Sequence, residues 1–321
     1  QGVVAGGGVI LLYTLLGGFR AVSWTDFVQG LIMVLALTAM PLLALAAAGG
    51  YGALLEGLGR LDPALVSVAG GKTGFALFGL VTGLFGIGLG YPGQPHVLTR
   101  YMAASSGEKI RQTQLIAMVW GVLVFYGAGY LGLAGRLVRP GLSDPEQLFP
   151  VLAKESLHPL LAGVMLAAIL SAIMSTVSSQ LLVAASAVSR DLMERGFGLA
   201  RSGRASLLAG RAAVVVLGLL AMAVAVGQVR VVFWFVLFAW SGLGAAFGPV
   251  VLLALWTRKV TPWGACAGMA TGFLVTVLWK AAGLSDRYIY ELVPAFFLAG
   301  AAVLLASALE RRLRGRAPSP W

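Results

Sequence analysis

Hydroxyl side chains recur along the segment ILSAIMSTVSSQLLVAASAVSRDL, which begins at Ile169. At about 100° per residue, its serines fall on one stripe of a helix. The stripe contains Ser171, Ser175, Ser178, Ser179, Ser186 and Ser189, with Ala172 and Thr176 at its edge. Hydroxyls are neutral oxygen ligands, suited to a weakly held hard cation such as Na⁺. Alternatively, they bond back to the carbonyl one turn earlier or link neighbouring helices, and the stripe alone favours this structural interpretation.

A second segment combines helix breakers with polar side chains. From Gly86 to Pro95 it has four glycines and two prolines in ten residues, so the helix should break there. Irregular backbone at membrane depth survives only where it is buried or lines a polar cavity, and such broken helices form binding sites in transporters. Tyr91 and Gln94 would add a phenol and an amide to that cavity. A proline kink near the cytoplasmic end, without a ligand, is the alternative. In either case we expect His96 to cap the break at the interface rather than to carry protons.

Several patterns resemble enzyme or cofactor motifs but lack the required context. Gly88, Gly90 and Gly93 spell GxGxxG, yet no strand precedes them, and Gly71-Lys72-Thr73 lacks the first glycine of a phosphate loop. The two histidines lie apart from any cysteine or carboxylate cluster, which disfavours a transition-metal site. The sequence therefore predicts neither an enzyme nor a bound cofactor.

The elements that carry these segments are membrane helices. The chain has 321 residues, of which 59% are hydrophobic and 11% charged, against about 25% charged in soluble domains. A bilayer core needs roughly 20 apolar residues per helix, and nine stretches qualify. They are roughly 3–18, 24–49, 75–104, 111–134, 158–189, 207–228, 231–256, 262–283 and 289–309. The prediction is one all-α, polytopic membrane domain, in which glycines 264, 268 and 272 mark close helix packing.

The basic excess gives an orientation. Loops on one side of the nine spans hold 15 basic and 5 acidic residues, a net of +10, and the opposite loops hold 8 basic and 7 acidic, a net of +1. By the positive-inside rule the first side is cytoplasmic, and with it the tail 310–321. The formal charge of +11 is thus a topological signal, and it gives no support to a nucleic-acid partner. The chain begins with Gln1 inside an apolar run, from which we expect a fragment.

Four segments together resemble the sodium/solute symporter family, with its sodium/proline members most similar. They are GGFRAVSWTDFVQG from Gly17, GYPGQPHVLTRYMAA from Gly90, the hydroxyl segment from Ile169, and FAWSGLGAAFGPVVLLALW from Phe238. The resemblance runs in order along nearly the whole chain.

This resemblance implies a leucine-transporter-like core of two inverted repeats of five helices, followed by peripheral helices. The nine spans would be the family's fifth to thirteenth, with the first four missing. Residues 3–49 would end the first repeat, 75–256 would form the second, and 262–309 would be two peripheral helices.

The resemblance also implies site residues. Ser175 and Thr176 match side-chain ligands of sodium, the carbonyl of Ala172 matches a backbone ligand, and Ser179 lies close by. Tyr91 and Pro95 match solute-binding residues of the sodium/proline members, with Gln94 between them. Those members have tryptophan where this chain has Ile87, which weakens the case for proline itself. Two further expectations concern Asp26, which matches a functionally sensitive aspartate, and Trp240 with Ser241, which are placed near the solute.

The expected function is Na⁺-coupled symport of a small organic solute, proline or a related amino acid or carboxylate, across the plasma membrane by alternating access. Na⁺, the solute and the lipid bilayer are the expected partners. A membrane solute sensor on the same fold and a nonfunctional fragment are the alternatives.

Overall fold

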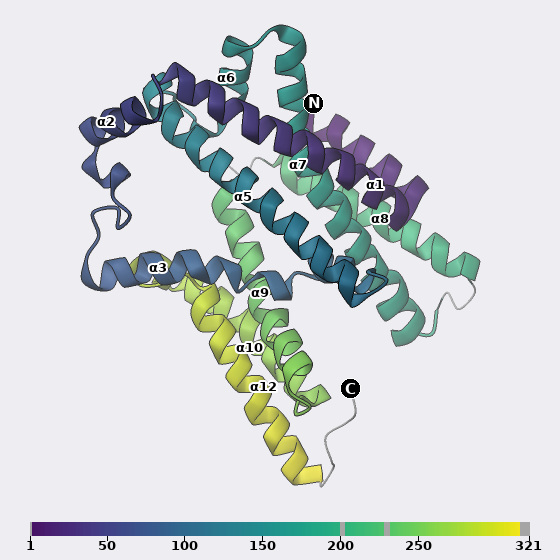
Figure 1. Ribbon diagram of the computed structural model, residues 1–321. Coiled ribbons are helices and arrows are strands. Elements are labelled where there is room, and N and C mark those ends of the chain that lie inside the picture. The colour runs from purple at the N-terminus through teal and green to yellow at the C-terminus, as the bar shows by residue number, and fades with distance from the viewer. Residues whose placement is uncertain (1, 200–202, 228–231, 315–321) are drawn as a thin grey trace. The chain divides into compact units, whose positions relative to one another are not determined.

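The structure is a computed structural model that describes residues 2–199, 203–227 and 232–314, and within these ranges it is helical without strands (Figure 1). The helices are α1 (Gly2–Ala47), α2 (Tyr51–Leu61), α3 (Gly74–Gly88), α4 (Pro95–Met102), α5 (Gly107–Val138), α6 (Leu148–Ser156), α7 (Pro159–Ser186), α8 (Gly203–Val226), α9 (Val232–Trp256), α10 (Pro262–Ala281), α11 (Leu284–Arg287) and α12 (Leu292–Arg314). Short 3-10 turns are η1 (Pro63–Val66), η2 (Tyr91–Gly93) and η3 (Pro145–Gln147), and η4 (Ala187–Gly196) is a π-helix that continues α7.

Eight helical segments of the described chain are long and apolar enough to cross a membrane, which confirms a polytopic membrane protein. The first two predicted spans are joined in α1. This helix has 46 residues, but Gly18 interrupts it with a left-handed backbone (φ 54°, ψ −151°). At 1.5 Å per residue its length is about twice a bilayer core. Figure 1 shows the chain reversing at the break, so 2–17 and 19–47 remain two membrane segments.

Two helices, α2 and α6, lie where the sequence predicts only connecting loops. Leu54 and Leu58 of α2 are fully buried, and Leu152 of α6 is 3% exposed. Each helix thus inserts apolar side chains into a neighbouring core, although its short length and its charged residues exclude a membrane span.

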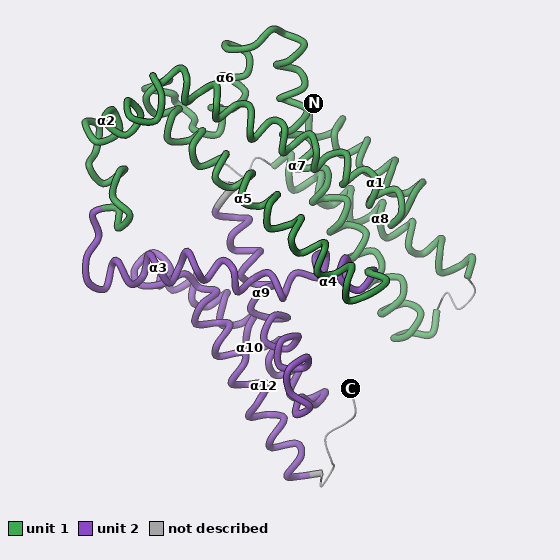
Figure 2. The backbone as a smooth tube through the Cα atoms, in the orientation of Figure 1, with its two compact units in different colours: residues 1–70, 104–228 green, residues 71–103, 229–321 purple. Residues whose placement is uncertain are grey.

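The chain divides into two compact units, drawn in different colours in Figure 2. Unit 1 comprises residues 1–70 and 104–228. Its main core joins α1, α2, α5, α6 and α7 around Met40 and Leu131, and a smaller core around Leu181 and Val214 joins α7 to α8. Helices α1 and α5 approach closely at Gly127, where an added Cβ would lie 1.9 Å from the carbonyl oxygen of Leu37.

Unit 2 comprises residues 71–103 and 229–321, of which 229–231 and 315–321, including most of the predicted tail, lie outside the described residues. Helices α9, α10 and α12 pack around Ala245, Leu292 and Phe296. A Cβ on Gly272 would lie 2.2 Å from the Ala245 carbonyl oxygen, which confirms the predicted close packing at this glycine. The repeat boundaries inferred from the resemblance stay a prediction.

Candidate functional site

The predicted helix break is present in unit 2. Helix α3 ends at Gly88, the 3-10 turn η2 follows, and α4 begins at Pro95. Gln94 has an extended backbone (φ −88°, ψ 110°), as expected for a residue that precedes proline. Pro95 then occupies the first turn of α4, where its missing N–H costs no helical hydrogen bond.

Gln94 links the helix break to α9 by hydrogen bonds. Its side chain is 1% exposed, and its Nε2 donates to the carbonyl oxygens of Gly90 at 3.3 Å and Trp240 at 3.1 Å. Trp240 makes a second hydrogen bond between α9 and this segment, because its Nε1 donates to the carbonyl oxygen of Ile87 at 3.0 Å. The Gln94 amide donor therefore satisfies freed backbone carbonyls, as irregular backbone inside a membrane protein requires.

Tyr91 is the predicted solute residue that the structure leaves accessible. Its ring meets the Trp240 ring edge to face at 4.9 Å between centroids, and the residue is 46% exposed. Four of the six predicted solute residues, Ile87, Tyr91, Gln94 and Trp240, are thus joined by direct contacts, and Pro95 follows Gln94 in the chain.

Ser241, the sixth, is fully buried and directed elsewhere. Its hydroxyl donates to the Phe238 carbonyl oxygen at 2.8 Å and to Oε1 of Glu291 at 3.2 Å. Sequence reasoning missed Glu291, since the two residues are 50 positions apart and no spacing rule connects them.

The glycines of the GxGxxG pattern do not share one role. A Cβ on Gly93 would lie 2.7 Å from the Gly244 Cα and from the Gly248 nitrogen, whereas a Cβ on Gly88 meets nothing within 4 Å. Backbone contact with α9 explains Gly93, and no nucleotide site is needed to explain it.

In unit 1, the predicted sodium ligands converge on one carbonyl. Ser175 Oγ and Thr176 Oγ1 each donate to the carbonyl oxygen of Ala172, both at 3.1 Å. Ser175 is half-buried and Thr176 is exposed. These are the back-bonds of the structural interpretation, and they gather three neutral oxygens, the ligand type that suits a weakly held hard cation, at one point on α7.

A polar cluster adjoins these oxygens. Ser179 Oγ donates to Oδ2 of Asp26 at 3.2 Å, and the Tyr13 hydroxyl donates to the Met174 carbonyl oxygen at 3.2 Å. Ser178, fully buried, donates to the Ser175 carbonyl oxygen at 3.2 Å. Both segments of α1 thus contribute polar groups to the serine face of α7, and the structure places Asp26 beside the predicted ligands.

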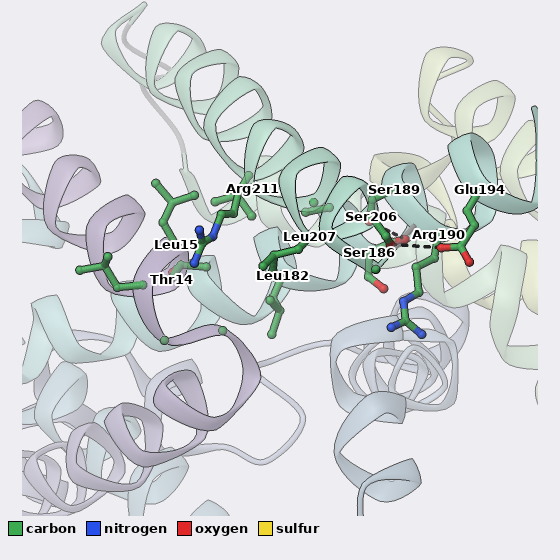
Figure 3. A pocket seen from close by; sticks show the side chains of 17 residues that line it. Thr14, Leu15, Leu182, Ser186, Ser189, Arg190, Glu194, Ser206, Leu207 and Arg211 are labelled. Carbon is green, nitrogen blue, oxygen red and sulfur yellow. Dashed lines mark hydrogen bonds between the residues drawn. The ribbon is translucent and has the colours of Figure 1, made fainter. Parts of the chain in front are cut away.

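At the break in α1, unit 1 contains a cavity of 680 Å³ that Gly17 and Gly18 help to line (Figure 3). Its polar lining comprises Thr14, Ser186, Ser189, Arg190, Glu194, Ser206 and Arg211. Ser206 Oγ donates to Oε2 of Glu194 at 3.1 Å. Thr14 is 2% exposed, and within the described part of the chain its Oγ1 has no hydrogen-bond partner. The serine stripe on α7 therefore continues into this cavity, whereas Ser206 and Arg211 come from α8 and were not predicted as site residues.

The family model for "Sodium:solute symporter family" matches residues 1–272 of the chain. The chain belongs to the sodium:solute symporter family. Relatives include the high-affinity proline transporter PutP of Bacillus subtilis (strain 168), 40% identical over 308 residues, and the sodium/proline symporter of Escherichia coli (strain K12), 38% identical over 323 residues. The two alignments cover 95% and 98% of this chain but 64% and 62% of the relatives, so the chain spans less than two thirds of their length. Both relatives are transporters, not enzymes.

A solved structure of a Na⁺-coupled sialic acid symporter has the same fold, with a TM-score of 0.75. The match covers 99% of this chain and 67% of that chain, at 18% sequence identity. The all-α symporter fold expected from the sequence is therefore confirmed.

Proposed function

We propose that this chain forms part of a Na⁺-coupled symporter for a small organic solute. The observation that carries the proposal is the convergence of Ser175 and Thr176 on the Ala172 carbonyl, in a family whose matched relatives include sodium/proline symporters by name. In this proposal sodium is transported together with the solute, and no covalent bond forms or breaks during transport.

The sodium position suits reversible binding. Three neutral oxygens, from Ala172, Ser175 and Thr176, hold a hard cation weakly enough for release. Ser179 and Asp26 lie alongside, so the nearest carboxylate contributes favourable charge without replacing the hydroxyls as ligands.

For the solute, we assign Tyr91 and Trp240 as the aromatic walls and Ile87, Gln94, Pro95 and Ser241 as their support. The edge-to-face ring pair gives an apolar surface that fits the ring or chain of proline or a related amino acid or carboxylate. The smaller Ile87 leaves the solute class broader than proline.

The cavity at Gly18 is our candidate for the cytoplasmic route. Arg190, Glu194 and Arg211 line it, and the predicted topology counts all three on the basic side of the chain. We accordingly assign the cytoplasm to this end of unit 1 and to the C-terminal tail.

Alternating access would use the repeats implied by the family: 3–49 as the end of the first, 75–256 as the second, and 262–309 as peripheral helices. Inward movement of one Na⁺ gains about 2.3 kcal/mol per 100 mV of membrane potential. This gain drives solute uptake only if sodium and solute each favour the conformation that the other binds.

The test uses the full-length protein in proteoliposomes. Ser175→Ala and Thr176→Ala should each raise the sodium concentration for half-maximal uptake by about tenfold, because a cation loses one ligand. Thr82→Ala is the matched control, since Thr82 also bonds back within a membrane helix, to the Phe78 carbonyl oxygen at 2.7 Å. Unchanged sodium dependence in both α7 variants would overturn the assignment.

A further inference from the structure

A second cavity, of 520 Å³, lies within unit 2, and Ile87 is the one residue of the proposed solute site that lines it. Helix α3 forms one wall with Leu80 and Gly83, α9 contributes Trp234, and the segment 285–291 closes the remaining side. Helix α3 packs closely against this segment at Gly79, where an added Cβ would lie 2.5 Å from the carbonyl oxygen of Tyr288.

Glu291 lines this cavity and is 2% exposed. Its Oε1 accepts from Ser241, which is itself fully buried. Within the described ranges no basic side chain forms an ion pair with Glu291, and the nearby Lys280 pairs with Asp286 at 3.5 Å. A buried carboxylate without a cationic partner is costly, so this cavity favours a ligand that brings a positive charge.

The rim of the cavity is mainly basic. Lys72, Lys280 and Arg287 line it together with the acidic Asp286, which pairs with Lys280, and the Lys280 ammonium lies 5.9 Å from the Trp234 ring centroid. A carboxylate at the buried end, aromatic side chains on the wall and basic groups at the mouth complement a molecule with an ammonium group at one end and an anionic group at the other. The cavity volume of 520 Å³ is larger than a bare ion would fill.

We propose that this cavity is a second binding site, for a zwitterionic amine whose ammonium group pairs with Glu291. The site is separate from the Tyr91–Trp240 ring pair and does not involve the sodium residues on α7. An amino acid and the headgroup of phosphatidylethanolamine share the required chemistry, so the experiment has one arm for each source.

The solute arm measures binding to the full-length protein in phosphatidylglycerol nanodiscs, in potassium chloride without sodium, by saturation-transfer NMR. Proline and pyrrolidine, which carry an ammonium group, should bind, and cyclopentanecarboxylate, which lacks one, should not. Glu291→Gln keeps the shape and the acceptor for Ser241, and should weaken both amines by about tenfold or more. Glu56→Gln is the matched control, because this carboxylate of α2 has a 67% exposed side chain, does not line the cavity and should change binding by less than about twofold.

The lipid arm uses native mass spectrometry after exchange into phosphatidylethanolamine. If the headgroup is the occupant, the wild type retains this lipid and Glu291→Gln does not. Ala76→Phe, at an exposed position of α3 that lines the cavity, keeps the carboxylate and should block either occupant, which covers the case in which Glu291→Gln does not fold.

Amine binding that is equal in the wild type and in Glu291→Gln, or binding of neither amine nor lipid, would overturn the proposal. Because this binding is measured without sodium, either result leaves the sodium assignment on α7 to its own test.

Discussion

At the scale of single residues, hydroxyl groups on α7 make hydrogen bonds whose geometry is compatible with the proposed sodium site. The bonds from Ser175 and Thr176 to the Ala172 carbonyl satisfy each hydroxyl hydrogen inside the membrane and leave oxygen lone pairs for a cation. The structural interpretation and the cation interpretation therefore describe the same atoms, which is why the serine stripe alone left both open.

Gln94 shows that the type of a residue alone does not predict which group its side chain bonds. Its amide was expected to add a polar group to a cavity, and its Nε2 instead bonds the Gly90 and Trp240 carbonyl oxygens. An amide side chain carries donors and acceptors that can bond either a ligand or the backbone. The Gln94 amide bonds the backbone because folding places the Trp240 carbonyl oxygen, 146 residues later in the chain, beside it.

Gln94→Ala should destabilise the protein by about 1–3 kcal/mol, since two buried carbonyls lose their donor. The measurement is the thermal unfolding midpoint of the purified full-length protein in detergent. Gln112→Ala is the control, because Gln112 is exposed on α5 and its Oε1 accepts a hydrogen bond from the exposed Lys109 side chain at 3.3 Å. Equal midpoints for the two variants would show that the Gln94 bonds do not hold the break in place.

At the scale of elements, backbone breakers proved more informative than polar side chains. Glycine and proline between Gly86 and Pro95 predict the break between α3 and α4, because their effect on the helix is local. The α2 and α6 helices were missed because their stability comes from tertiary burial of a few leucines, such as Leu54 and Leu58, and a short amphipathic helix has little signal of its own.

Gly93→Ala should impair folding, because the new Cβ would lie 2.7 Å from backbone atoms of Gly244 and Gly248 that cannot move aside. Overpacking of this kind costs about 1–3 kcal/mol. Gly88→Ala is the control within the same pattern, since nothing lies within 4 Å of its added Cβ and alanine favours a helix by up to about 1 kcal/mol.

The measurement is the amount of folded protein in the membrane, by fluorescence-detected size exclusion of a fusion protein. A Gly93→Ala variant as abundant as Gly88→Ala would contradict the close backbone contact between η2 and α9.

At the scale of the whole molecule, composition and hydropathy suffice for the membrane class and for most spans. They do not predict that Ser241 meets Glu291 or that Thr14 of α1, Ser186 of α7 and Arg211 of α8 line one cavity, because each grouping depends on packing between distant segments. The family resemblance supplied the predicted sodium residues before the structure, and the structure added their convergence on one carbonyl.

The central claim is that sodium entry drives solute accumulation, and proteoliposomes that contain the full-length protein test it most directly. With sodium outside, potassium inside and a negative interior potential, labelled proline or a related amino acid should accumulate above its external concentration, and collapse of the sodium gradient should release it. Sodium-dependent binding without accumulation for any amino acid or carboxylate tried would contradict symport and would instead indicate a solute sensor on this fold.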